Sequence, residues 1–145
     1  MGDLAGIIRQ FRDSDLQTTL EMLVDYSDSL PPLPDRYVPL LESSDARVPE
    51  CETPVFLWVE VDGGRVGIFA QVPEESPTVR GFVSILIDAF TGASPLEVEE
   101  APADILHRLG LDKKIGTRRM YGLGAVYARI RREVRDKAEA SSLKQ

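Results

Sequence analysis

Two side chains could support covalent chemistry in this sequence of 145 residues, the thiol of Cys51 and the imidazole of His107, and each is the only one of its kind. Cys51 lies between Pro49 and Pro54, with a glutamate on either side, directly before an apolar run. A lone cysteine cannot form an internal disulfide, so the chemistry open to it is nucleophilic attack or thiol exchange. The sequence therefore points first to one thiol on a proline-bracketed turn.

The position of Cys51 permits two interpretations. Free cysteine is among the most buried residue types and commonly acts as a small hydrophobe. Prolines and charged neighbours, in contrast, mark a turn at the surface, where chains display reactive groups. A nearby carboxylate such as that of Glu50 also disfavours the thiolate form. Spacing alone leaves burial and exposure of the thiol equally open.

A cysteine hydrolase would need His107 as its base, within hydrogen-bond reach of Cys51. His107 lies inside the stretch ADILHRLGL, which is typical of an amphipathic helix. With one His and one Cys, the chain also lacks the group of ligands that a zinc site uses. We therefore expect no bound metal, and we interpret His107 as an ordinary helix residue.

Composition and charge exclude several classes of protein. A chain that is 43% hydrophobic and 28% charged is typical of one globular domain, and no apolar run approaches the roughly 20 residues of a membrane span. The first residues lack the pattern of a secretory signal, so we expect a cytoplasmic protein without membrane contact. The net charge of -7 disfavours general binding to nucleic acid.

The charge is unevenly distributed along the chain. Residues 118–137 contain seven Arg or Lys and two acids, which makes this segment net +5 and leaves -12 on the rest. This segment has two possible interpretations. It forms a basic helix face that is exposed to solvent, or it forms a surface that docks an acidic partner.

The order of predicted elements is a helix, a loop, a hairpin and then helices, which indicates an α+β fold. Ser14-Asp15 begins a helix whose apolar residues recur at helical spacing up to Leu30: Leu16, Leu20, Leu23 and Val24. The four prolines of the stretch PPLPDRYVPLLESSD predict an extended loop over the surface. Four apolar residues of this loop are expected to hold it down: Leu33, Tyr37, Leu40 and Leu41.

A hairpin and a buried helix form the predicted centre. The apolar runs 55–61 and 65–70 are joined by Asp62-Gly63-Gly64, which favours an antiparallel hairpin. Ser76-Pro77 begins a helix that is apolar almost all round and ends at Gly92, so it should be central. Shorter helical pieces are expected to begin at Ser94-Pro95 and at Pro102-Ala103-Asp104.

The last helix is predicted from about Thr117, with one apolar face at helical spacing: Met120, Leu123, Tyr127, Ile130 and Val134. Gly122 and Gly124 within it follow no strand, so they do not form a dinucleotide-binding loop. We interpret them as a site where the helix backbone packs closely against a neighbour. Residues 139–145 are predicted to form a disordered polar tail after a single domain at 1–138.

Three segments together resemble the SufE family of sulfur-acceptor proteins. The first is residues 48–57, which place Cys51 at the acceptor position. The second is Val79-Arg80-Gly81 followed by the apolar helix, and the third runs from Arg118-Arg119 to Gly122-Leu123. The resemblance extends from the first predicted helix to about Arg135. It implies a SufE/NifU-like fold, in which a small antiparallel sheet packs against helices.

The resemblance also implies a function. A SufS-like cysteine desulfurase, which uses pyridoxal phosphate, would load sulfur onto Cys51, and this chain would stimulate that enzyme and pass the sulfur to a SufBCD-like iron–sulfur cluster scaffold. The chain itself would need no cofactor and would act as an accessory protein rather than as a free-standing enzyme. It would be a monomer or a weak homodimer. A single thiol fits this role, because a second one nearby would release the sulfur.

The resemblance implies supporting residues as well. Arg119, with Arg118 as a one-residue alternative, would hold the Cys51 loop or dock the desulfurase. Glu75 and Arg80, near the start of the central helix, would assist. Arg119 and Glu75 could equally be structural ion-pair partners. A loop held against the domain at rest would have to swing out to react. The competing hypothesis is an interaction module whose cysteine is incidental.

Overall fold

The protein is described here by a computed structural model that covers residues 3–143, and its centre is an antiparallel hairpin. Strands β1 (Phe56–Asp62) and β2 (Arg65–Gln71) pair in a register that runs from Phe56 opposite Gln71 to Asp62 opposite Arg65. Gly63 and Gly64 form the turn with positive φ angles, which glycine adopts readily. The predicted hairpin is confirmed.

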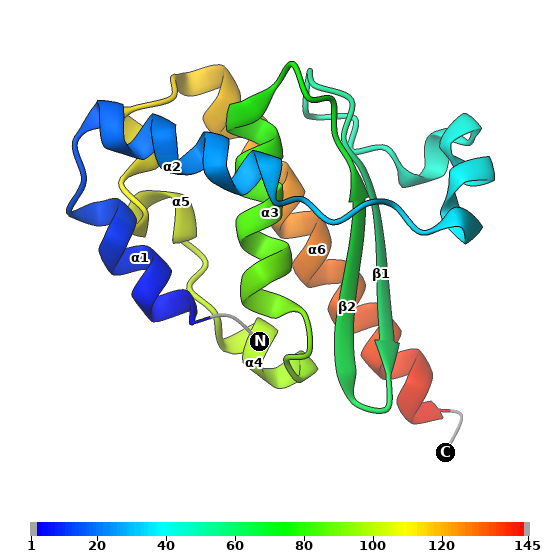
Figure 1. The fold of residues 1–145 in the computed structure, drawn as a ribbon. Helices are drawn as coiled ribbons and strands as arrows, with labels where there is room; N and C mark the ends of the chain where they lie inside the picture. The colour runs from blue at the N-terminus through cyan, green and yellow to red at the C-terminus, as the bar shows by residue number, and fades with distance from the viewer. Residues whose placement is uncertain (1–2, 144–145) are drawn as a thin grey trace.

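The two faces of the hairpin have different environments. Residues that alternate along the strands are buried on the inner face: Leu57, Val59, Val66, Ile68 and Ala70. On the outer face Tyr37 stacks on Trp58 with ring centroids 4.8 Å apart, and Arg36 donates a hydrogen bond to Glu60. The segment that follows helix α2 and carries Arg36 and Tyr37 therefore crosses the outer face of the hairpin (Figure 1).

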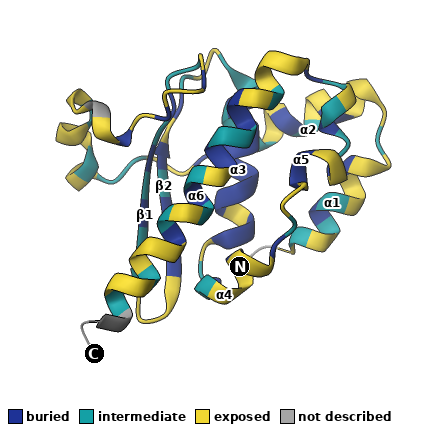
Figure 2. Cartoon of the chain, turned by 180° about the vertical axis from the view of Figure 1, so that it is seen from behind, coloured by how far each residue is buried: buried dark blue, intermediate teal, exposed yellow. Residues whose placement is uncertain are grey.

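Helix α3 (Pro77–Phe90) is the buried centre of the molecule, as predicted. Ten of its residues are buried, because its sequence is apolar on almost every side, and the buried colour is concentrated on α3 and the hairpin (Figure 2). Helix α2 (Leu16–Asp28) crosses α3 closely at Gly81, where any added Cβ would collide with the carbonyl of Leu23. The glycine permits this crossing.

Helix α6 (Thr117–Leu143) packs along β1, and four members of its predicted apolar face are buried: Leu123, Tyr127, Ile130 and Val134. The predicted start at Thr117 is confirmed. The helix continues to Leu143, whereas the sequence predicted disorder from residue 139; glutamate and alanine in this stretch have high helix propensity. Residues 144–145 of that predicted tail lie outside the described residues.

Short elements complete the chain: α1 (Leu4–Arg12), η1 (Asp35–Glu42), η2 (Ser44–Ala46), α4 (Pro95–Glu100), α5 (Ile105–Arg108) and η3 (Leu111–Lys113). Ser94 caps α4 in a capping box with Glu97, at the predicted start. Residues 35–42 form a 3₁₀ helix rather than the predicted extended loop. Leu40 is exposed there, so Tyr37 and not Leu40 holds this segment to the domain.

The apolar residues that recur along α2 lie mostly in solvent. Leu23 is buried, but Leu16, Leu20 and Val24 are 51%, 40% and 44% exposed. Helix α2 packs on α3 through the face that carries Thr19, Leu23 and Ser27 instead. The predicted helix after Ser14-Asp15 is confirmed, and most of the apolar residues that indicated it lie on its exposed side.

No helix within residues 3–143 is both long enough and apolar enough to span a membrane.

Candidate functional site

Cys51 lies on a loop whose two ends are joined to each other. Arg47 bridges to Phe56 as an extension of β1, and the amide of Val48 donates a hydrogen bond to the carbonyl of Val55. The amide of Cys51 in turn donates to the carbonyl of Val48, which closes a tight turn. Residues 49–54 thus form a short loop on a fixed base.

The thiol points inward, against helix α6. Cys51 is only 4% exposed, although its neighbours Pro49, Glu50 and Glu52 are exposed. A Cβ added at Gly122 would lie 3.1 Å from the Cys51 sulfur and 3.3 Å from its Cα. The structure confirms that Gly122 is a site of close packing, and it identifies the cysteine loop as the neighbour.

Burial raises the pKa of the Cys51 thiol above its ordinary value. A hydrogen bond from the backbone of Thr53 and the charge of Arg47 oppose this increase in pKa, while Glu52 adds to it. The resting thiol is therefore covered by the domain, and its burial favours the protonated form.

Arg129 fastens the segment that leads into the loop, from η2 to Arg47. Its guanidinium donates hydrogen bonds to the carbonyls of Asp45 and Arg47 and pairs with Glu133 at 2.8 Å. The sequence analysis did not identify this residue. Its position seven residues after Gly122 puts it on the same side of α6, which is the signal that could have revealed it.

The two candidate arginines at the start of α6 differ in their contacts. Arg118 pairs with Glu52 of the cysteine loop at 3.6 Å, with both side chains largely exposed. Arg119 is exposed and makes no ion pair or side-chain hydrogen bond within the part of the chain that the structure describes. Arg118 is therefore the one that touches the loop, and Arg119 is free to meet another molecule.

Glu75 lies at the same end of the molecule as the thiol. It follows β2, whose last residue Gln71 pairs with Phe56 directly after the cysteine loop. In Figure 1 the segment before α3, the loop before β1 and the start of α6 are together at the top. Glu75 is exposed and forms no ion pair among residues 3–143.

Arg80 has packing contacts. It donates hydrogen bonds to the carbonyl of Ser27 at the end of α2 and to that of Val72 after β2. Gly81 also approaches the backbone of α2 closely. The run Val79-Arg80-Gly81 therefore has a packing role, because it connects α3 to α2 and to the end of the hairpin. None of the hydrogen bonds of Arg80 in the described structure reaches the cysteine loop.

His107 is engaged elsewhere. Its Nδ1 pairs with Asp112 at 2.8 Å, and its side chain is 69% exposed. No hydrogen bond joins His107 to Cys51 within residues 3–143. The geometry thus offers no base for a cysteine hydrolase.

The fold and the site together define a single α+β domain that holds one thiol closed on a loop. The chain belongs to the SufE family: residues 5–134 match the family model described as "SufE: Fe-S metabolism associated domain". It is 36% identical over 134 residues to proteins from two strains of Mycobacterium tuberculosis, which are named as uncharacterized SufE-like proteins. The match covers 92% of this chain and 92% of each of those proteins.

More distant relatives and a solved structure agree with this assignment. A SufE-like protein of Synechocystis sp. is 26% identical over 126 residues, which are 86% of this chain and 76% of that protein. The solution structure of a hypothetical protein from Thermus thermophilus superposes with a TM-score of 0.79 at 30% identity and covers 94% of this chain and 96% of the other. The α+β fold predicted from the sequence is confirmed.

Proposed function

We propose that this protein accepts persulfide sulfur on Cys51 from a pyridoxal-phosphate-dependent cysteine desulfurase and passes it to an iron–sulfur cluster scaffold. The observation that carries the proposal is the placement of the only cysteine at the tip of a loop with a fixed base. Membership of a family associated with iron–sulfur metabolism supports it. A reducing compartment, the cytoplasm, suits a carrier that must keep one thiol unpaired.

The transfer is a thiol exchange without net oxidation. The Cys51 thiolate attacks the terminal sulfur of the donor persulfide, an S–S bond forms at Cys51, and the S–S bond in the donor breaks. The donor cysteine leaves as a thiolate, and the proton of the Cys51 thiol passes to solvent. A second exchange in the same sense delivers the sulfur to the scaffold.

The raised pKa of Cys51 suits a carrier that acts only in complex. Burial keeps the thiol protonated at rest, so a partner must draw the loop out and expose it to solvent or to cationic groups before attack. The exposed side chains of Arg119 and Glu75 at the same end of the molecule are available for that contact. We assign them to docking of the desulfurase.

The test is to mix the protein with a cysteine desulfurase and L-cysteine and to measure its intact mass. We expect a gain of one sulfur atom at Cys51 that a reductant removes, because Cys51 is the only thiol present. Cys51→Ser should gain none and should remain folded. An unchanged mass of the unsubstituted protein at saturating partner and substrate would refute the proposal and favour an interaction module without covalent chemistry.

A further inference from the structure

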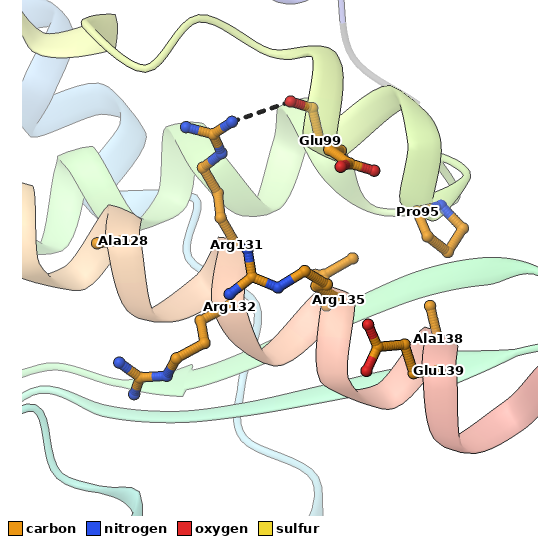
Figure 3. Close-up of a pocket in the computed structure, with 9 residues that line it drawn as sticks. Pro95, Glu99, Ala128, Arg131, Arg132, Arg135, Ala138 and Glu139 are labelled. Atoms are coloured by element: carbon orange, nitrogen blue, oxygen red, sulfur yellow. Dashed lines mark hydrogen bonds between the residues drawn. The ribbon is translucent and has the colours of Figure 1, made fainter.

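A groove of about 830 Å³ lies between α4 and α6. Nine residues line it: Pro95, Glu99, Ala128, Arg131, Arg132, Val134, Arg135, Ala138 and Glu139 (Figure 3). Its volume lies within the range of pockets that bind drug-sized ligands or short peptide side chains. The groove shares no residue with the cysteine loop.

The charges in the groove are only partly used within the chain. Arg131 donates one hydrogen bond to the carbonyl of Glu99 and lies over the ring of Tyr127. Arg132 and Arg135 are exposed, and neither makes an ion pair or a side-chain hydrogen bond within residues 3–143. Two guanidinium groups thus keep their full set of donors for a carboxylate.

The carboxylates of the groove are separated from its guanidinium groups. In Figure 3 the three guanidinium groups lie toward Ala128, while the carboxylates of Glu99 and Glu139 lie toward Pro95. The apolar lining that reaches the surface comes from Pro95 and Ala138, which are half-buried, because Val134 lies beneath them in the core. The groove therefore offers a cationic end beside an apolar wall.

The groove and the thiol are on different sides of α6. Arg131 comes nine residues after Gly122, which is about two and a half helical turns and about 14 Å along the axis. The half turn places Arg131 opposite the side of α6 that contacts Cys51. A molecule bound in the groove would leave the cysteine loop uncovered.

We propose that the groove between α4 and α6 binds an acidic segment of a partner protein that also carries apolar side chains. Carboxylates of the segment pair with Arg132 and Arg135, and its apolar side chains cover Pro95 and Ala138. Charge complementarity selects this occupant, because the groove lies in the segment 118–137, which is net +5, while the rest of the chain is net -12. This binding does not depend on the sulfur-transfer function proposed above, and both sites can be occupied together.

Nucleic acid is the less suitable occupant. A polyanion extends past a short groove onto the surrounding acidic surface, where its phosphates are repelled. A peptide segment needs only a few carboxylates at the cationic end of the groove. The experiment below separates these two occupants.

The probe is a fluorescein-labelled peptide of the sequence Glu-Glu-Leu-Glu-Glu-Leu-Glu-Glu, with binding followed by fluorescence anisotropy at low ionic strength. The full chain should bind this peptide and should not bind the version in which Lys replaces Glu. The double variant Arg132→Gln with Arg135→Gln should bind about tenfold more weakly, because it loses two charge-assisted contacts. Arg131 is left in place because its contacts hold α4 to α6.

The matched control removes the same charge elsewhere. Arg9→Gln with Arg12→Gln changes two exposed arginines of α1, and binding should stay within about twofold of that of the unsubstituted protein. Cys51→Ser should bind the peptide unchanged, which separates this result from any failure of sulfur transfer. An equal loss in the α1 variant, no binding of the acidic peptide, or tighter binding of a thymidine oligonucleotide would each overturn the proposal.

Discussion

The sulfur of Cys51 lies against the bare backbone of Gly122, in a position where the Cβ of any other residue would stand 3.1 Å away. Gly122 is inside helix α6, where alanine would otherwise be preferred by about 1 kcal/mol. The glycine therefore has a packing role: it provides the space in which the thiol rests. Two residues far apart in the chain thus meet at the buried thiol.

Gly122→Ala should open the cysteine loop. The added methyl group crowds the sulfur and makes the closed loop less stable relative to the open loop. A loss of about 1 kcal/mol of this stability would raise the rate of thiol alkylation about fivefold, because the open loop would be populated more often. Global stability should change by no more than about 1 kcal/mol in either direction, because improved helix propensity offsets the crowding. Alkylation by iodoacetamide and urea unfolding would measure the two effects.

Gly124→Ala is the matched control for this substitution. Its Cβ would meet only the side chain of Leu106, at 4.0 Å, which is an ordinary contact. We expect unchanged alkylation of Cys51 and a gain in stability of up to about 1 kcal/mol. Equal alkylation rates in Gly122→Ala and the unsubstituted protein would show that Gly122 does not control the loop.

Arg129→Lys should loosen the segment before the cysteine loop. Lysine keeps the charge but cannot reach the carbonyls of Asp45 and Arg47 with a planar fork, so stability should fall by about 1 to 3 kcal/mol and alkylation of Cys51 should speed up. Glu133→Gln removes only the ion pair and should have a smaller effect, below about 1 kcal/mol. If the two variants behaved alike, the ion pair and not the carbonyl contacts would hold the segment.

The raised pKa of Cys51 predicts a loss of stability at alkaline pH. The folded state favours the protonated thiol, so the buried thiol contributes to the free energy of unfolding. This contribution is complete below the ordinary pKa of about 8.5 and disappears as pH rises through the folded-state pKa. Between about pH 8 and pH 10, the urea midpoint should therefore fall further in the unsubstituted protein than in Cys51→Ser. Comparing these two proteins cancels the tyrosines, whose titration they share. Parallel curves would contradict the prediction.

Local patterns in the sequence predicted the central elements correctly. The alternation around Trp58 and the Gly63-Gly64 turn specify the hairpin, and the run Phe82 to Phe90 specifies a buried helix, because each pattern is complete within one element. The spacing of Leu16, Leu20, Leu23 and Val24 predicted helix α2 but not which of these residues it buries. Helical spacing shows that a face is apolar, but not whether another element covers it.

The site could be predicted only in part. Residues around Cys51 indicated a turn, and the resemblance supplied its role, but the burial of the thiol depends on Gly122 in a distant helix. The contact of Arg129 with backbone carbonyls has no pattern of residue types, since any residue has a carbonyl. Helix α1 was not separately predicted, although Asp3 and the spacing of Ile7 and Phe11 signal it.

Arg119→Ala should reduce sulfur transfer while leaving the fold intact. Its side chain makes no ion pair among the described residues, so stability should change by less than about 0.5 kcal/mol. If its planar fork binds the desulfurase, Arg119→Lys should be as poor as alanine. Arg118→Ala breaks the exposed pair with Glu52 and should mainly affect alkylation of the thiol. Full transfer by Arg119→Ala at limiting desulfurase would exclude it from docking.

Leu86→Ala tests the core. Leu86 is fully buried in α3, so the cavity left by the substitution should lower the free energy of unfolding by about 2 to 5 kcal/mol. Sulfur transfer per folded molecule should not change. A loss below about 0.5 kcal/mol in urea unfolding would mean that α3 does not form the core.

The closed thiol also determines how the protein withstands oxidants. Peroxides and foreign disulfides attack an accessible thiolate, and at rest Cys51 is neither accessible nor ionised. Damage therefore accumulates only during the fraction of time in which the loop stands open, so the working lifetime of an idle molecule depends on its opening equilibrium as well as on the oxidant concentration. A substitution that made the thiol more reactive would shorten that lifetime by the same factor.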